Sequence, residues 1–286
     1  MRASVCLAVM SAVLCPARAA YQGFNYGAFF TDNTPKMQLD FQAEFKTAQN
    51  LVGAPAGGFH SARPYTMIQW GTATDVISAV PAAIATNTNL LLGIRCSAGD
   101  AVVSNELAAL QTAIPTHGTR FTDLVVGISV GSEDLYRSSA ATIASYVARV
   151  RAAVRGTPLE GTPWADPANR AVLEPVDFVG MDAYSYWEST VPNEVGGSRA
   201  KALFDAAMDH TVAATAAVDV RKMVWITETG FPVRGHTSNE AVPSPENAKA
   251  FWDAVGCPLF DISCAEIAGE RGDDGVNSDD DACDAE

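Results

Sequence analysis

The strongest constraint on the fold is a series of short apolar segments that alternate with amphipathic ones along the chain. Six segments are expected to form strands, and several are near-continuous apolar runs: 24–27, 60–66, 89–95, 123–130, 176–184 and 222–228. Such runs are typical of parallel strands, because helices cover both faces of a parallel sheet. The sequence therefore predicts an α/β fold built on a parallel sheet.

Segments with helical periodicity fall between these strands. The expected helices lie near 35–51, 74–86, 104–115, 139–154, 199–217 and 245–255. In the fourth, Ile143, Val147 and Val150 share one face. The last begins with Ser244 as a capping residue and Pro245 in its first turn. Strand–helix repetition at this spacing is compatible with a doubly wound sheet or with a (β/α)8 TIM barrel.

The turn after the first strand distinguishes the two architectures. A doubly wound dinucleotide-binding fold carries a glycine-rich phosphate turn there, whereas this chain has the aromatic and polar stretch 25-NYGAFFTDN-33. No P-loop and no exposed-serine elbow motif occurs elsewhere in the sequence. We therefore expect the barrel.

The two ends of the chain differ in composition from its middle. Residues 1–19 combine Arg2, an apolar stretch and the small residues of 17-ARA-19, a pattern typical of a secretory signal peptide rather than of a first helix. Residues 266–286 are acidic and of low complexity, so we expect a disordered tail. Residues 20–265 then form one barrel domain. No later segment is apolar enough for a membrane span, and the net charge of −14 argues against nucleic acid as a partner.

Four cysteines lie beyond the expected signal peptide: Cys96, Cys257, Cys264 and Cys283. Four thiols permit three disulfide pairings, and the sequence does not choose among them. Their spacing fits no usual zinc pattern, and the four histidines are scattered. We expect no metal and no other cofactor.

Two of the expected strands lead into a glutamate. Glu133 follows the strand 123–130, and Glu228 ends the strand 222–228. A single glutamate at such a place is more often the first charge of a helix. In a parallel barrel, however, the carboxyl ends of all strands share one rim, so two such residues can face each other there. Cleavage of a glycosidic bond needs a pair of carboxyl groups in this arrangement.

Three segments make the sequence similar to a known family. In this order, 128-ISVGSEDLYR-137, 178-FVGMDAY-184 and 223-MVWITETGFP-232 resemble family 17 of the glycoside hydrolases, of the fungal glucan endo-1,3-β-glucosidase and glucan β-glucosidase type. The likeness extends over roughly residues 22–260. It implies a secreted retaining glycosidase that hydrolyses or transglycosylates β-1,3-glucan, located outside the cell or in the cell wall. We expect a monomer.

The resemblance also implies roles for individual residues. Glu133 corresponds to the general acid/base and Glu228 to the nucleophile, and retention implies carboxyl groups about 5–5.5 Å apart. Tyr184 directly ends a strand and is the strongest candidate for a substrate contact. The other candidate substrate-binding residues are Tyr26, Tyr65, Ser132 and Phe231. An aromatic residue at a strand end belongs to the core as often as to a cleft.

The sequence departs from the family pattern in several places. Ser132 stands where related barrels usually have asparagine, and Arg95 stands where fungal relatives typically have an aromatic residue. Strands five and eight are missing or irregular: the stretch 156–175 has no strand-like run, and 258–263 is at most an irregular replacement for the last strand. The barrel is therefore expected to be incomplete, through an incomplete gene model or a real loss. The alternative function is a non-catalytic glucan-binding relative associated with the wall.

Overall fold

The computed structural model describes residues 21–54, 58–160, 162, 164–165, 173, 175–188 and 198–260. Within these residues, seven strands form one parallel sheet whose spatial order follows the chain. The strands are β1 (Gly23–Tyr26), β2 (Ser61–Pro64), β3 (Asn89–Ile94), β4 (Val125–Val130), β5 (Trp164–Ala165), β6 (Phe178–Asp182) and β7 (Met223–Glu228). The predicted α/β fold with a parallel sheet is confirmed.

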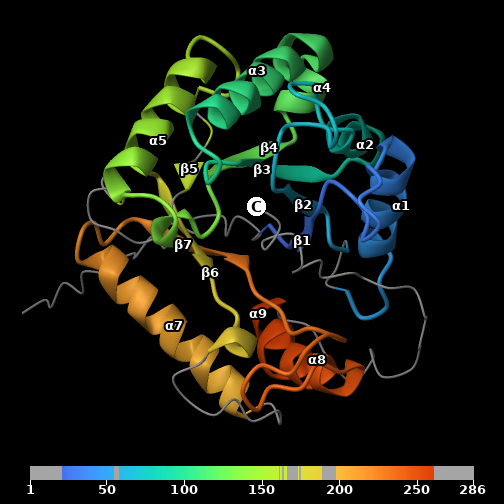
Figure 1. Ribbon diagram of the computed structural model, residues 1–286, viewed down its shortest axis with the longest axis vertical. Coiled ribbons are helices and arrows are strands. Elements are labelled where there is room, and N and C mark those ends of the chain that lie inside the picture. The colour runs from blue at the N-terminus through green and yellow to red at the C-terminus, as the bar shows by residue number, and fades with distance from the viewer. Residues whose placement is uncertain are drawn as a thin grey trace, which may run out of the picture.

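Helices surround the sheet, close to the ranges that the sequence predicts (Figure 1). They are α1 (Gln38–Gln49), α2 (Ala79–Thr86), α3 (Asp100–His117), α4 (Thr119–Thr122), α5 (Ala140–Val154), α7 (Ser198–Ala216), α8 (Pro245–Phe251) and α9 (Cys257–Phe260). A π-helical turn, Trp252–Gly256, joins the last two. Short 3₁₀ helices, Asp134–Tyr136 and Ser185–Trp187, follow β4 and β6.

The predicted cap of α8 is in place, and the structure shows a second one at α5. The Ser244 hydroxyl accepts a hydrogen bond of 3.1 Å from the Asn247 amide, and Pro245 occupies the first turn of α8. Ser139 caps α5 in the same way, through the Thr142 amide. Both caps satisfy amide groups that a helix start leaves without a partner.

Apolar side chains form two clusters, one in each half of the molecule. The larger cluster joins β1–β4 to α1, α2, α3 and α5, and includes Phe45 and Leu92. The smaller one joins β6 and β7 to α7 and α8, and includes Met181, Phe204 and Phe251. Figure 1 shows these halves above and below the sheet. Both therefore support the strand ends from which the site residues project.

The region between α5 and β6 contains a strand that the sequence analysis did not predict. β5 pairs with β4 through Ile128–Trp164 and Ser129–Ala165, and with β6 through Ala165–Phe178. Strand five was expected to be missing or irregular, and the strand found there has only two residues. A strand of two residues is too short to produce a periodic pattern, so its neighbours identify it and its own sequence does not.

The sheet has two edges, β1 and β7, and the described residues contain no eighth strand between them. Of the segment 258–263, expected as a possible replacement for that strand, residues 258–260 belong to helix α9 instead. A side chain crosses the gap: the Asn25 amide donates a hydrogen bond of 3.1 Å to the backbone oxygen of Thr227. The two edges therefore lie close to each other.

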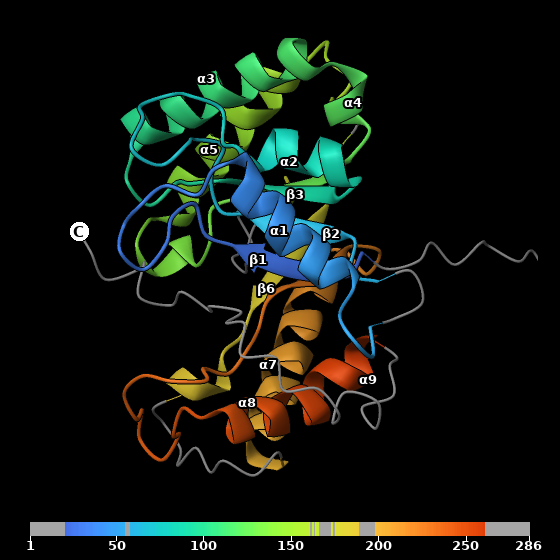
Figure 2. The same ribbon diagram turned by 90° about the vertical axis from the view of Figure 1, so that its right-hand side faces the viewer.

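The loops that follow the strands gather on one side of the sheet. In Figure 2, β1 points to the left, and the loops after β1, β2 and β7 lie on that side. Pro64 is the last residue of β2, a position where a missing amide hydrogen does little harm to the ladder. The rim expected from a set of parallel strands is thus present.

The expected signal peptide 1–19 and tail 266–286 lie outside the described residues. Among the helices within the described ranges, none combines the length and apolar character that a membrane span requires.

Candidate active site

A tight turn after β4 presents Ser132 and Glu133 at the rim. Gly131 has φ +84°, and a Cβ atom there would lie 2.1 Å from Asp134 Oδ2. That carboxylate oxygen accepts a hydrogen bond of 2.9 Å from the Ser132 amide. Glu133 itself has φ +52°, in the left-handed region that non-glycine residues seldom adopt. Strained backbone of this kind is common where a side chain must be aimed at a site.

Glu228 ends β7 and is 7% exposed. Its Oε1 accepts hydrogen bonds from the Arg63 guanidinium and, at 2.6 Å, from the Ser132 hydroxyl. Its Oε2 accepts one of 3.0 Å from the Tyr184 hydroxyl. The donors come from β2, from the turn after β4 and from the end of β6, so three separate elements fix the orientation of this carboxylate. A buried carboxylate requires such partners.

Arg63 supplies the positive charge of the site. It is 4% exposed, lies over the Tyr65 ring and donates a second hydrogen bond, of 3.3 Å, to Ser129 Oγ. Burial works to lower the pKa of Arg63, but the negative charges of Asp182 and Glu228 outweigh it, and the net shift of the pKa is upward. The guanidinium is therefore a permanent cation between two acids.

Asp182, at the end of β6, joins the same network. Its Oδ1 accepts a hydrogen bond of 2.6 Å from Thr227 Oγ1, and its Oδ2 lies 3.5 Å from Ser132 Oγ. Burial raises the pKa of Asp182, Arg63 opposes this, and the charges of Glu228 and Glu133 raise the pKa further. Because Glu133 acts on Asp182 and Ser132 bridges Asp182 to Glu228, the three carboxyl groups belong to one cluster.

The structure brings together most of the residues singled out from the sequence. Ser132 and Tyr184 contact Glu228 directly, and Tyr65 lies against Arg63. Tyr26 is buried instead, with its ring 4.8 Å from that of Phe45 on α1.

Phe231 is also nearly covered, and it packs on Tyr186 and Phe251 in the smaller apolar cluster. These contacts place Tyr26 and Phe231 among core side chains, away from the donors around Glu228.

Two members of the network were not recognised as site residues from the sequence. Neither Asp182 nor Arg63 was among the candidate residues. A signal for Arg63 was present, because an arginine inside a buried parallel strand needs an anionic partner. Arg95, noted as a departure from the family pattern, is exposed at the end of β3. Burial raises the pKa of Asp134, and the charge of Arg95 opposes this rise.

Two of the cysteines are now assigned. Cys96 is buried with its Sγ 3.3 Å from the Ile94 carbonyl oxygen and is not part of a disulfide, whereas Cys257 is disulfide-bonded. The disulfide of Cys257 therefore does not involve Cys96. Cys264 and Cys283 lie outside the described residues. Within the described ranges, no group of three or more His, Cys, Asp or Glu side chains is placed to hold a metal ion.

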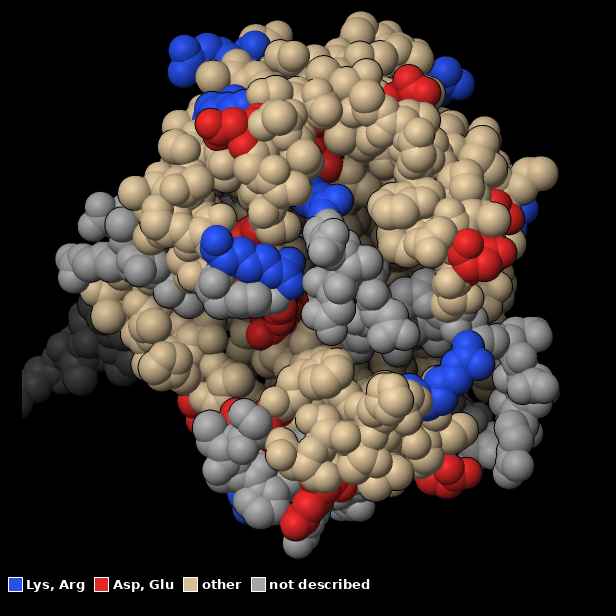
Figure 3. All heavy atoms as spheres, viewed as in Figure 1, with Lys and Arg blue, Asp and Glu red and all other residues tan. Residues whose placement is uncertain are grey.

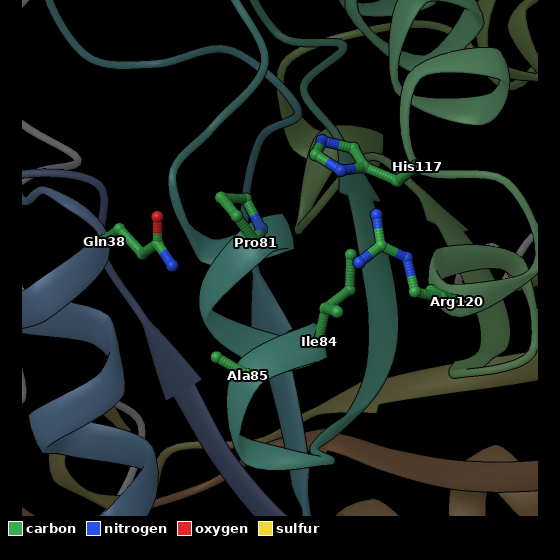
Figure 4. Close-up of a pocket in the computed structure, with 6 residues that line it drawn as sticks. All are labelled: Gln38, Pro81, Ile84, Ala85, His117 and Arg120. Atoms are coloured by element: carbon green, nitrogen blue, oxygen red, sulfur yellow. The ribbon is translucent and has the colours of Figure 1, made fainter.

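The face with the carboxyl ends of the strands carries charged side chains in a depression near its middle (Figure 3). A separate hollow of about 340 Å³ lies between α2 and the end of α3, and includes His117, Arg120 and Ile84 (Figure 4). None of the carboxyl groups of the cluster lines that hollow.

Comparison with known proteins identifies the class. Residues 23–267 match the family model of the BtgE/BtgC glycoside hydrolase domain, so the chain belongs to this family of glycoside hydrolases. A curated relative, the probable glucan endo-1,3-beta-glucosidase eglC of Aspergillus terreus, is 50% identical over 277 residues, which cover 89% of this chain and 55% of the relative. The corresponding protein of Aspergillus fumigatus is 49% identical over 276 residues, covering 89% and 60%. The chain thus spans little more than half the length of these relatives.

Solved structures support the fold. The glycoside hydrolase family 17 beta-1,3-glucanosyltransferase from Rhizomucor miehei matches with a TM-score of 0.65 and 24% identity, over 84% of this chain and 83% of that one. A Ruminococcus gnavus beta-glucuronidase matches with a TM-score of 0.55 and 16% identity, over 84% and 40%. The resemblance to family 17 inferred from the sequence is confirmed.

Proposed function

We propose that this chain is a retaining glycosidase that cleaves or transfers β-1,3-glucan. The observation that carries the proposal is the Glu228 carboxylate, held by Arg63, Ser132 and Tyr184 at the strand ends beside the turn that presents Glu133. The names of the curated relatives and of the Rhizomucor miehei enzyme support the substrate class.

In this mechanism Glu133 protonates the oxygen of the leaving sugar while Glu228 attacks the anomeric carbon. The C–O bond to the leaving sugar breaks, and a bond from the sugar to Glu228 forms. Glu133, now ionised, removes a proton from an incoming hydroxyl, which displaces Glu228 and restores both groups. Water as the acceptor gives hydrolysis, and a sugar hydroxyl gives transfer. Arg63, Ser132 and Tyr184 are positioning residues that orient Glu228 for attack.

The wider organisation is part of the same proposal. Residues 20–265 form a (β/α)8 barrel domain that acts as a monomer, after removal of a signal peptide (1–19) and ahead of an acidic tail (266–286). Seven parallel strands in chain order and the Asn25–Thr227 contact across the open edge support a barrel. The disulfide at Cys257 fits secretion to the cell exterior or wall, because disulfides persist in oxidising compartments.

Turnover of laminarin, a soluble β-1,3-glucan, tests the assignment. We expect Glu133→Gln and Glu228→Gln each to reduce kcat by about 10³-fold or more, because each removes a group that reacts in the transition state. Glu246→Gln, at an exposed position in the first turn of α8, is the matched control and should turn over like the wild type. Equal activity in all four proteins would refute the roles of the two glutamates.

The exposed Arg95 and the absence of an eighth strand among the described residues favour one alternative, a glucan-binding protein without turnover. It predicts that the wild type sediments with insoluble β-1,3-glucan and releases no reducing sugar. If the wild type does cleave the glucan, NMR of the first product shows from its anomeric form whether the configuration of the cleaved sugar is retained.

A further inference from the structure

Two loops on the rim, outside the carboxylate cluster, pack against each other. The loop after β1 folds back through an antiparallel bridge between Phe29 and Pro35. The loop after β2 does the same through a bridge between Ile68 and Val76. Figure 2 shows both loops, in blue and cyan, projecting to the left of β1. None of the three side chains that donate hydrogen bonds to Glu228 belongs to either loop.

An aromatic pair joins the two loops at their tips. The rings of Phe29 and Trp70 are stacked, with centroids 3.9 Å apart and planes inclined by 30°. The Trp70 ring nitrogen donates a hydrogen bond of 3.0 Å to the Asn33 carbonyl. The buried amide of Gln69 donates one of 2.9 Å to the Lys36 carbonyl, which ties the loops together next to the pair. The orientation of the indole ring is thus fixed before any ligand arrives.

The outer face of Trp70 remains open. Trp70 is 36% exposed. Phe29 covers one face of its ring and Asn33 covers the ring nitrogen, so the exposed area belongs mainly to the opposite face of the ring. The neighbouring Gly71 has open space beside it, because a Cβ atom there would meet no atom within 4 Å. A stack that served only the core would be covered on both sides.

We propose that Trp70, backed by Phe29, is a binding platform for a glucose unit of a β-1,3-glucan chain at a distance from the bond that is cleaved. The proposal rests on the proposed function. The apolar C–H face of a pyranose ring packs on an aromatic face, while its hydroxyls remain in water. The loop of Trp70 also contains Tyr65, whose ring lies against Arg63, so one loop carries both the platform and a neighbour of the Glu228 site. A long glucan chain can reach both the Trp70 platform and the carboxylate site, whereas a short chain fills only the carboxylate site.

The test compares long laminarin with laminaritriose in the full chain. For Trp70→Ala we expect the ratio of kcat/KM on laminarin to kcat/KM on laminaritriose to fall by about five- to tenfold, the size of one lost aromatic contact. The loss should lie in KM rather than kcat, because the platform binds the ground state and the transition state alike. Trp70→Phe keeps an aromatic face and should recover much of the ratio.

Leu39→Ala, at a 77% exposed position on α1, is the control for loss of exposed apolar surface and should keep the wild-type ratio. Thermal unfolding of each variant separates loss of the platform from loss of the fold. An unchanged ratio in folded Trp70→Ala overturns the platform while the proposed function stands. A wild type that neither cleaves nor binds laminarin overturns the proposed function instead.

Discussion

Arg63 and Glu228 form an ion pair whose side chains are only 5% and 8% exposed. Removing one member of a buried pair leaves an uncompensated charge and costs about 3–5 kcal/mol, whereas exposed pairs contribute about 0–1 kcal/mol. The pair therefore fixes the orientation of the nucleophile candidate. A second buried acid, Glu106, has no part in that chemistry but shapes the loop beside it.

Glu106 lies on α3 and is fully buried. Its Oε1 accepts a hydrogen bond of 2.5 Å from Thr66 Oγ1, and its Oε2 accepts one of 2.6 Å from the Met67 amide, in the loop that carries Tyr65 and Trp70. Burial raises the pKa of Glu106 from 4.5 to about 7, although both hydrogen bonds and Arg95 oppose the shift. The charged form is thus disfavoured in the folded protein.

This shift predicts a pH dependence of stability. A carboxyl group whose folded pKa is raised favours folding when it is protonated. Its contribution is present below pH 4.5 and is lost as the pH rises from there to about 7. Glu106→Gln cannot titrate, so between pH 4.5 and 7.5 the free energy of unfolding of the wild type should fall by on the order of 2 kcal/mol more than that of the variant.

Urea unfolding at several pH values measures the difference. Asp182 and Asp134 also have raised pKa values, so Glu106→Gln should reduce the slope without removing it. Glu246→Gln, at an exposed position, should keep the wild-type slope. Parallel curves for the wild type and Glu106→Gln would show that the carboxyl group does not titrate differently in the two states.

At the scale of elements, the turn after β4 depends on a glycine. Gly131→Ala and Gly99→Ala both place a side chain at a positive φ, +84° and +87°, which costs about 1–3 kcal/mol in each case. Only at Gly131 would the new Cβ also meet a neighbour, at 2.1 Å from Asp134 Oδ2. The Asp134 carboxyl group must then move and release the Ser132 amide.

We expect Gly131→Ala to lower kcat/KM on laminarin by about tenfold or more, since a displaced Ser132 no longer holds Glu228. Gly99→Ala, at a position with no atom within 4 Å of the new Cβ, should lose stability but keep its turnover. Paired measurements of kcat/KM and of urea unfolding distinguish the two effects. Equal kinetics in the two variants would mean that the turn tolerates a shifted Asp134.

The strands and helices also differ in how far they could be predicted from the sequence. The six longer strands, the Ser244 cap and the two rim glutamates follow local rules of periodicity and strand ends, so the sequence was sufficient for them. The ion pair of Arg63 depends on a partner far along the chain, which no local pattern identifies. The faces of parallel strands are both buried, so alternation could not tell that Tyr26 enters the core.

At the scale of the whole molecule, no strand of the described residues pairs with the outer edges of β1 and β7, so side-chain contacts join these edges. Asn25→Ala leaves the backbone oxygen of Thr227 without the donor that crosses this edge. We expect a loss of about 1–3 kcal/mol in the free energy of unfolding, with faster hydrogen exchange of the β7 amides. Asn50→Ala, which removes a 2.7 Å hydrogen bond to Lys46 at an exposed helix end, should cost less, about 1 kcal/mol or below.

The Arg63–Glu228 pair crosses the same edge, because Arg63 lies on β2 and Glu228 on β7. The described sheet curves round so that its first and last strands, β1 and β7, lie close together with a gap between them. Such an arrangement opens most easily by widening of that gap. Such a widening would lengthen the ion pair between Arg63 and Glu228, which orients the nucleophile candidate. The orientation of Glu228 therefore depends on how closely β1 and β7 are held together, and we expect contacts that brace this gap, such as the Asn25–Thr227 hydrogen bond, to stabilise that orientation.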